Sequence, residues 1–217
     1  MNPLNSDVGA VQFLQQLVEI RSLSGEETAV AQFLVAQMNQ SGFTAHVDAA
    51  GNAVGERHCP NANGQITQEI VLLGHMDTVP GDIPVRQEEG KLYGRGSVDA
   101  KGPLASFIVA ASRASLPPGT RLVVVGAVEE EAATSKGARH VASQMQPDLC
   151  VIGEPSGWDG ITLGYKGRLL IDATFAQPMS HTAGAESGAA ELGLDWYNAI
   201  MAYIGQFNAN QSRLFNQ

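Results

Sequence analysis

Three short apolar runs, each followed by acidic or imidazole side chains, constrain this chain more than any other feature of its sequence. The runs are Ile70–Leu73, Leu122–Val125 and Leu149–Ile152. Continuous apolar runs of this length are typical of strands that are buried on both faces. Helical patterns over 100–116 and 136–145 separate them. This alternation predicts an α/β fold, with a mostly parallel sheet and helices on both faces.

Two further helices are expected before the first of these strands. Residues 6–21 carry apolar side chains at helical spacing. Ser24–Glu27 has the Ser-x-x-Glu pattern of a capping box, and it predicts the start of a second helix that Gly42 ends. Phe43–Asp48 alternates like a strand, whereas the polar segment 58–69 is typical of an exposed loop.

The pattern changes near residue 160. Ile161–Phe175 is a long alternating stretch that predicts a strand, and 185–207 has the spacing of an amphipathic helix. We therefore expect an α/β domain over 1–160 and the opening of a different, α+β domain over 161–217. One strand and one helix are too little to bury a core alone.

Composition excludes several classes of protein. No apolar run reaches the roughly 18 residues that a membrane span needs, and the start lacks the pattern of a signal peptide. Acidic residues outnumber basic ones 22 to 13, and the net charge of −9 argues against binding to nucleic acids or anionic membranes. Cys59 and Cys150 are expected to be reduced thiols, which points to the cytoplasm.

The side chains that follow the strands are expected to meet in one cleft. His75 and Asp77 follow the first run, Glu129–Glu131 the second and Glu154 the third, while Asp99 lies in a glycine-rich loop before a helix. In open α/β sheets the ligand site lies at the carboxyl ends of the strands. Crowded carboxylates repel one another, and a pair of divalent cations neutralises them most simply.

The types of ligand favour zinc. Imidazole with carboxylates suits Zn²⁺ or a close relative better than Ca²⁺ or Mg²⁺, which prefer oxygen alone. The spacing of two places His75 and Asp77 on one face of a strand, so Asp77 can accept the second imidazole N–H. Taken singly, Glu129–Glu131 could be a solvated loop, Glu154 a turn residue and Asp99 a helix cap. Their common position at strand ends favours the metal site.

Four motifs in this order carry a resemblance to a known family: Gly74–Pro80, Gly94–Gly102, Glu129–Glu131 and Ile152–Pro155. Together they resemble the zinc amidohydrolases and exopeptidases that include acetylornithine deacetylase, succinyl-diaminopimelate desuccinylase and glutamate carboxypeptidase. Within that family, Val98–Pro103 and Val79–Gly81 look most like the lysine/ornithine hydrolases of amino-acid biosynthesis. Those enzymes release the amino acid from an acetyl group or from an acidic amino-group carrier protein.

The resemblance implies a zinc exopeptidase-like catalytic domain, a ferredoxin-like lid that forms a homodimer, and two divalent metals, Zn²⁺ or Co²⁺. It also implies a role for each candidate: the catalytic residues are Asp77, Glu130 and His181, and the metal ligands are His75, Asp99, Glu131 and Glu154. Glu130 would be the general base and Glu131 a ligand, although Glu129 and Glu130 are the alternative pair. His181, in the lid, would stabilise the oxyanion.

One departure from the family affects the second metal. The family has a further metal-binding histidine beyond the lid, whereas this chain stops at Gln217, and neither His140 nor His181 has the right context. One metal site is therefore expected to be incomplete. Two alternatives stay open beside the amidohydrolase: a non-catalytic metal-binding remnant or fragment, and a dipeptidase or carboxypeptidase of the same family. A nucleotide-binding domain is disfavoured, because the GxGxxG and P-loop patterns are absent.

Overall fold

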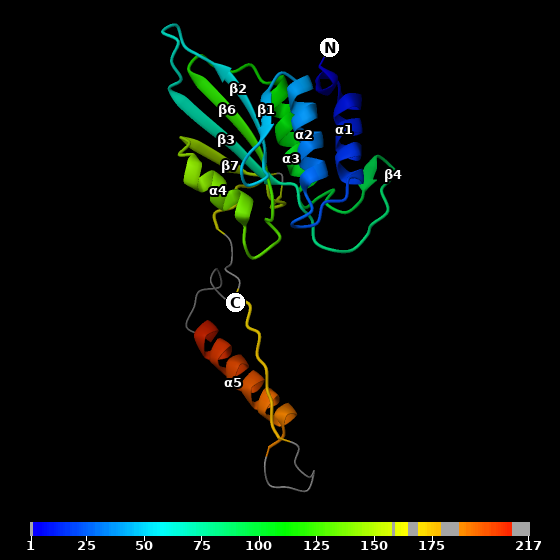
Figure 1. Ribbon diagram of the computed structural model, residues 1–217, viewed down its shortest axis with the longest axis vertical. Helices are drawn as coiled ribbons and strands as arrows, with labels where there is room; N and C mark the ends of the chain where they lie inside the picture. The colour runs from blue at the N-terminus through cyan, green and yellow to red at the C-terminus, as the bar shows by residue number, and fades with distance from the viewer. Residues whose placement is uncertain (1, 158, 165–168, 179–186, 210–217) are drawn as a thin grey trace. The chain divides into compact units, whose positions relative to one another are not determined.

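The computed structural model describes residues 2–157, 159–164, 169–178 and 187–209. The chain forms two compact units, Met1–Ser156 and Gly157–Gln217 (Figure 1). The first unit contains all of the predicted strand-end side chains, from His75 to Glu154. Each unit is therefore described by itself.

The first unit is built on a five-stranded sheet with the order β1-β2-β6-β3-β7. Its strands are β1 (Thr44–Val47), β2 (Ala53–Cys59), β3 (Gln68–His75), β6 (Thr120–Ala127) and β7 (Leu149–Ile152). β3 runs parallel to β6 and β7, whereas β2 is antiparallel to both β1 and β6. The α/β fold is confirmed, but the sheet is mixed, because a tight turn joins β1 to β2 and a short hairpin connection forces antiparallel pairing.

Helices cover both faces of this sheet, as predicted (Figure 1). The helices are α1 (Asp7–Glu19), α2 (Thr28–Gln40), α3 (Lys101–Arg113) and α4 (Lys136–Gln144). The larger apolar cluster joins Val124 of β6 to residues of α1, α2 and α3, and the smaller one joins Val123 and Val125 to Val141 of α4. Successive side chains of a strand point to opposite faces, so β6 is buried on both sides.

The strand β7 differs from the prediction because it is not buried. Leu149 is 51% exposed and Ile152 is 58% exposed. In the part of the chain that the structure describes, β7 pairs with β3 alone and lies at the edge of the sheet. Its apolar run therefore identifies a strand correctly but not the burial of that strand.

The predicted capping box before the second helix is also wrong. α2 begins at Thr28, and the side chain of its N-cap residue, Glu27, accepts no hydrogen bond from the N–H groups of the first turn. The Ser24 hydroxyl instead donates to Asp77 Oδ2 at 2.7 Å. Gly25, with φ of +87°, turns the chain between Ser24 and Glu27, a conformation that glycine adopts without strain.

Smaller elements complete the first unit. They are a 3₁₀ turn, η1 (Pro3–Asn5), and a hairpin of β4 (Arg86–Glu88) and β5 (Lys91–Tyr93). The polar loop that was expected over 58–69 is shorter, because β2 extends to Cys59 and β3 begins at Gln68.

The second unit contains the predicted amphipathic helix, α5 (Ala189–Ala209). The ring of Phe175 lies 5.9 Å from that of Trp196, measured between centroids. The strand predicted over Ile161–Phe175 is absent from residues 161–164 and 169–175, which have no neighbouring strand to pair with in the described residues. The ferredoxin-like lid stays a prediction. None of the described helices combines the length and the hydropathy that a bilayer crossing requires.

Candidate metal centre

The carboxyl ends of the three parallel strands meet at one edge of the sheet. His75, the last residue of β3, lies opposite Ala127, the last residue of β6, and Leu73 lies opposite Ile152 at the end of β7. The chain after β6 and the chain after β7 therefore both begin beside His75. The pairing register brings the predicted strand-end residues into one site, as expected for an open α/β sheet.

His75 is at the centre of this site, and its side chain is 1% exposed. Its Nε2 atom lies 3.2 Å from Asp99 Oδ1, 3.7 Å from Glu154 Oε1 and 3.9 Å from Glu130 Oε2. Two groups of ligand atoms result, each with all members within 4.8 Å of one another: His75, Asp99 and Glu154, and His75, Glu130 and Glu131. One imidazole among carboxylates is a donor set that suits zinc and related cations.

Asp77 holds His75 from the opposite side of the imidazole ring. His75 Nδ1 lies 3.0 Å from the Asp77 carbonyl oxygen and 3.3 Å from Asp77 Oδ1. Because Nδ1 faces acceptor oxygens of Asp77, it can donate a hydrogen bond to Asp77, which leaves Nε2 as the ring nitrogen that a bound metal would contact. The sequence spacing predicted this contact, which is the usual support for a metal-binding histidine.

The Asp77 carboxylate itself is fully buried and accepts three further hydrogen bonds. The donors are Ser24 Oγ at 2.7 Å and the backbone N–H groups of Glu130 and Glu131, each at 3.1 Å. Burial raises the pKa of Asp77, but the hydrogen bonds from His75, from Ser24 and from the two N–H groups outweigh burial and lower it. Asp77 therefore stays ionised and links β3 to the glutamate run after β6.

The charges in the site are unbalanced. Burial lowers the pKa of His75, but the hydrogen bond to Asp77 and the neighbouring carboxylates, Glu154 first, raise it to about 9. Burial raises the pKa of Glu154 to about 7, and the charge of Glu130 adds to this effect while His75 opposes it. Burial also raises the pKa of Glu131. Facing carboxylates of this kind are stabilised by cations, so the donor set and the charge both fit bound metal.

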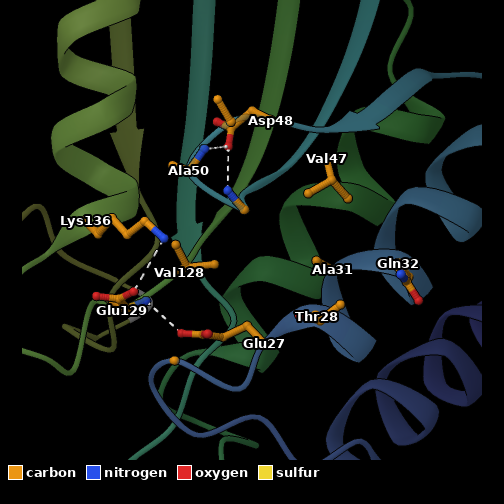
Figure 2. Close-up of a pocket in the computed structure, with 13 residues that line it drawn as sticks. Glu27, Thr28, Ala31, Gln32, Val47, Asp48, Ala50, Val128, Glu129 and Lys136 are labelled. Atoms are coloured by element: carbon orange, nitrogen blue, oxygen red, sulfur yellow. Dashed lines mark hydrogen bonds and ion pairs between the residues drawn. The ribbon is translucent and has the colours of Figure 1, made fainter.

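The glutamate run divides between two places. Glu130 and Glu131 face His75, whereas Glu129 Oε2 accepts a hydrogen bond from Thr134 Oγ1 at 2.6 Å and Oε1 lies 3.7 Å from Lys136 Nζ. Figure 2 shows the contact between Glu129 and Lys136 beside a pocket. A left-handed backbone at Glu129, with φ of +54°, precedes the change in direction. Of the two pairs that the sequence left open, the geometry favours Glu130 and Glu131.

The pocket of Figure 2 lies next to the site and has a volume of about 380 Å³. Glu27, Asp48, Glu129 and Lys136 are its charged lining residues, and none of the residues grouped around His75 lines it. The pocket is therefore separate from the candidate metal centre. The two meet only where Glu129 precedes Glu130.

The other histidines among the described residues do not join the site. His140 lies on α4 and its Nε2 is 3.7 Å from Asp48 Oδ2, so it does not supply the missing ligand. His58 Nε2 contacts Glu56 Oε2 at 3.0 Å. His181, predicted to act on the oxyanion, lies outside the described residues.

Sequence reasoning missed two residues that support the site. Ser24 bonds to Asp77, and Glu27 Oε1 accepts a hydrogen bond from the Glu129 N–H at 2.9 Å. The polar side chains of Ser24 and Glu27 were recognised in the sequence, but they were interpreted as a capping box at the start of a helix.

Comparison with known proteins gives a consistent result. The profile of Peptidase family M20/M25/M40 matches residues 71–212. The chain is 53% identical to the [LysW]-lysine hydrolase of Deinococcus radiodurans, over 90% of this chain and 54% of that protein. It is 32% identical to the [LysW]-lysine/[LysW]-ornithine hydrolase of Saccharolobus islandicus, over 82% of this chain and 49% of that protein. The chain thus spans about half the length of these curated relatives.

Solved structures share the fold at lower identity. Human carnosine dipeptidase 1 aligns with a TM-score of 0.55 and 21% identity, over 67% of this chain and 38% of that one. The aminoacylhistidine dipeptidase of Vibrio alginolyticus aligns with a TM-score of 0.53 and 20% identity, over 70% of this chain and 35% of that one. These likenesses confirm the fold class that the strand and helix pattern predicted.

Proposed function

Since this chain belongs to peptidase family M20/M25/M40, we propose that it forms the metal-binding part of a hydrolase. The hydrolase cleaves the amide bond that joins lysine or ornithine to an amino-group carrier protein. One observation carries the proposal: the buried His75 imidazole faces four carboxylates, in a chain 53% identical to a [LysW]-lysine hydrolase. The relative's name supplies the substrate class, and the cluster supplies the chemistry.

The residues around His75 divide into two metal sites. His75, Asp99 and Glu154 would hold the first cation, and Glu131 would hold the second, with Asp99 as a ligand of both. Zn²⁺ is the proposed metal, with Co²⁺ as its closest substitute, because imidazole and carboxylate donors suit both. Once His75 is assigned to the first cation, no other described histidine is left for the second, so we expect the second cation to bind more weakly than the first.

Each residue then has a distinct task in the hydrolysis. The bound cations supply polarisation of the amide carbonyl and a lowered pKa for the attacking water. Glu130, whose carboxylate is 43% exposed, takes the proton of that water and returns it to the leaving amine. Asp77 keeps the proton on His75 Nδ1, so that Nε2 remains a ligand. His181 is proposed to donate a hydrogen bond to the oxyanion.

The proposed function also indicates the substrate, the oligomeric state and the cellular compartment. The substrate is the amino acid on its acidic carrier, or a small N-acyl amino acid, and a homodimer forms through the second unit. Cys59 and Cys150 are both free, which supports a reducing, cytoplasmic environment.

Metal content tests the metal centre directly. We expect the purified chain to bind Zn²⁺ and His75→Ala to lose the tighter ion, because the proposed first site then has no imidazole ligand. His140→Ala is the matched control, since His140 contacts Asp48 and belongs to neither group of ligand atoms. Equal zinc content in His75→Ala and the unchanged chain would overturn the metal centre.

Turnover tests the reaction itself. A version extended to the length of the relatives, loaded with Zn²⁺ or Co²⁺, is expected to release lysine or ornithine from the carrier-linked substrate faster than from acetyl-lysine, acetylornithine or dipeptides. Faster hydrolysis of dipeptides would favour a dipeptidase instead. Bound metal without turnover of any of these substrates would favour the non-catalytic remnant.

A further inference from the structure

Three successive backbone N–H groups of the glutamate run donate to two carboxylates. The Glu129 N–H donates to Glu27 Oε1 at 2.9 Å, and the Glu130 and Glu131 N–H groups donate to the two oxygens of Asp77 at 3.1 Å. Both acceptors are buried, with Glu27 5% and Asp77 0% exposed. Hydrogen bonds to ionised acceptors are roughly twice as strong as neutral ones, so these bonds fix the path of the run.

A role in capping α2 does not explain the burial of the Glu27 side chain. Glu27 is the N-cap residue of α2, but its side chain makes no capping hydrogen bond. Its carboxylate reaches instead across to the chain after β6, as Figure 2 shows. A buried carboxylate costs free energy unless it is hydrogen-bonded, and the Glu27 carboxylate accepts the first N–H of the glutamate run.

Ser24 acts on the same run through Asp77. Its hydroxyl donates to Asp77 Oδ2, the oxygen that also accepts from the Glu131 N–H. The chain around Ser24 is fixed beside the end of β3, because Ser22 Oγ donates to the Met76 carbonyl at 2.7 Å and the Thr78 N–H donates to the Ser22 carbonyl at 2.8 Å. The segment Ser22–Glu27 thus connects the chain after β3 to the chain after β6.

We propose that Ser24 and Glu27 are positioning residues for the candidate metal centre. Glu27 fixes the backbone at Glu129, and Ser24 fixes the Asp77 carboxylate that holds Glu130 and Glu131. The left-handed turn at Glu129, with φ of +54°, then directs Glu129 to Lys136 and its two successors to His75. Any effect of Ser24 and Glu27 on catalysis rests on the proposed function. Their effect on the backbone position of residues 129–131 does not.

Residue-resolved amide hydrogen exchange on the metal-free chain tests the positioning role. In Glu27→Ala we expect the Glu129 amide to exchange at least about tenfold faster, since a hydrogen bond to a charged acceptor is lost. In Ser24→Ala we expect a severalfold increase at Glu130 and Glu131. The amides of Ala50 and Gly51 are the internal reference, because they donate to Asp48 in a separate turn.

Conservative variants separate positioning from a general effect on folding. Glu27→Gln keeps the acceptor oxygen and Ser24→Thr keeps the hydroxyl, so both are expected to restore slow exchange. Glu26→Ala is the matched control, because Glu26 is exposed and its carboxylate pairs with Arg21 and not with the glutamate run. Equal increases at the reference amides, or failure of Glu27→Gln to restore protection, would overturn the proposal.

Cobalt binding supplies a second readout. We expect Glu27→Ala and Ser24→Ala to weaken the weaker of two Co²⁺ ions by about 10- to 100-fold, the usual effect of losing a residue that supports a ligand. Its visible absorption spectrum should change, while the affinity for the tighter ion falls less. Unchanged affinity for both ions, in variants whose amides at 129–131 exchange faster, would also overturn it. Amide exchange tests the positioning of residues 129–131 whether or not the protein is a hydrolase.

Discussion

We expect the substitution of Asn52 by alanine to lower the free energy of unfolding of the first unit substantially. Asn52 is fully buried, and its side chain joins three segments. Nδ2 donates to Asp48 Oδ2 at 2.9 Å and to the Gly137 carbonyl at 3.2 Å, and Oδ1 accepts from the Val128 N–H at 3.0 Å. The turn between β1 and β2, the residue after β6 and the first turn of α4 therefore all depend on one amide.

The cost of Asn52→Ala follows from those three hydrogen bonds. The Val128 N–H is left buried without its acceptor, which costs about 1–3 kcal/mol. The bond to the Asp48 carboxylate contributes about 1.5–3 kcal/mol, as is usual for a charged acceptor. The Gly137 carbonyl is less affected, because it lies in the first turn of a helix and keeps its acceptor role there. We expect a loss of about 4 kcal/mol in the free energy of unfolding.

Urea denaturation followed by far-ultraviolet circular dichroism measures this loss. With a slope of about 2 kcal/mol per molar, the midpoint should fall by about 2 M. Asn39→Ala is the matched control, because Asn39 is exposed and its two hydrogen bonds to Ala45 are replaceable by water. A midpoint for Asn52→Ala that is indistinguishable from that of Asn39→Ala would refute the reasoning.

Three further predictions concern the core, acid stability and catalysis. Leu104→Ala, which removes a fully buried side chain of α3, should lower the free energy of unfolding by about 3 kcal/mol in the same urea assay. Hydrogen bonds from Arg121 outweigh burial and lower the pKa of Glu56, so its stabilising effect is present above the ordinary pKa of 4.5 and is lost as pH falls through the lowered value. Urea midpoints between pH 5 and 3 should therefore fall less steeply in Glu56→Gln. In the extended version, Glu130→Gln should lower kcat by about 100-fold or more with zinc content unchanged, whereas Glu131→Gln should lower zinc content.

The sequence was sufficient for the parallel half of the fold, because burial on both faces leaves a strong pattern. The runs Ile70–Leu73 and Leu122–Val125 lie within β3 and β6, and the residues after them meet as predicted. The strand β2 was missed, because Glu56, Arg57 and His58 interrupt its apolar residues. Those polar side chains are accommodated by cross-strand contacts such as Arg121 with Glu56, which are not visible in a single segment.

The metal candidates could be predicted for a related reason. A metal ligand must be a residue of a particular chemical type. His75, Asp99 and Glu154 could therefore be identified as candidates from their residue types alone. Supporting residues have no such restriction, and Ser24 and Glu27 differ from ordinary helix-capping residues only in what they contact. Their contacts depend on the approach of β3 and β6, which is a property of the folded sheet.

The strand predicted over Phe43–Asp48 is confirmed as β1, and the mixed sheet explains why missing β2 left the predicted site intact. The residues of the candidate metal centre end β3, follow β6 or β7, or precede α3, and none lies on the antiparallel hairpin. The hairpin reaches the site only indirectly, through Asn52 and its bond to Val128. Asn52 and Glu27 thus fix the chain after β6 from two sides, immediately before Glu130. Substitution of Asn52 or Glu27 by alanine should therefore increase amide exchange in the glutamate run under conditions in which the sheet remains folded.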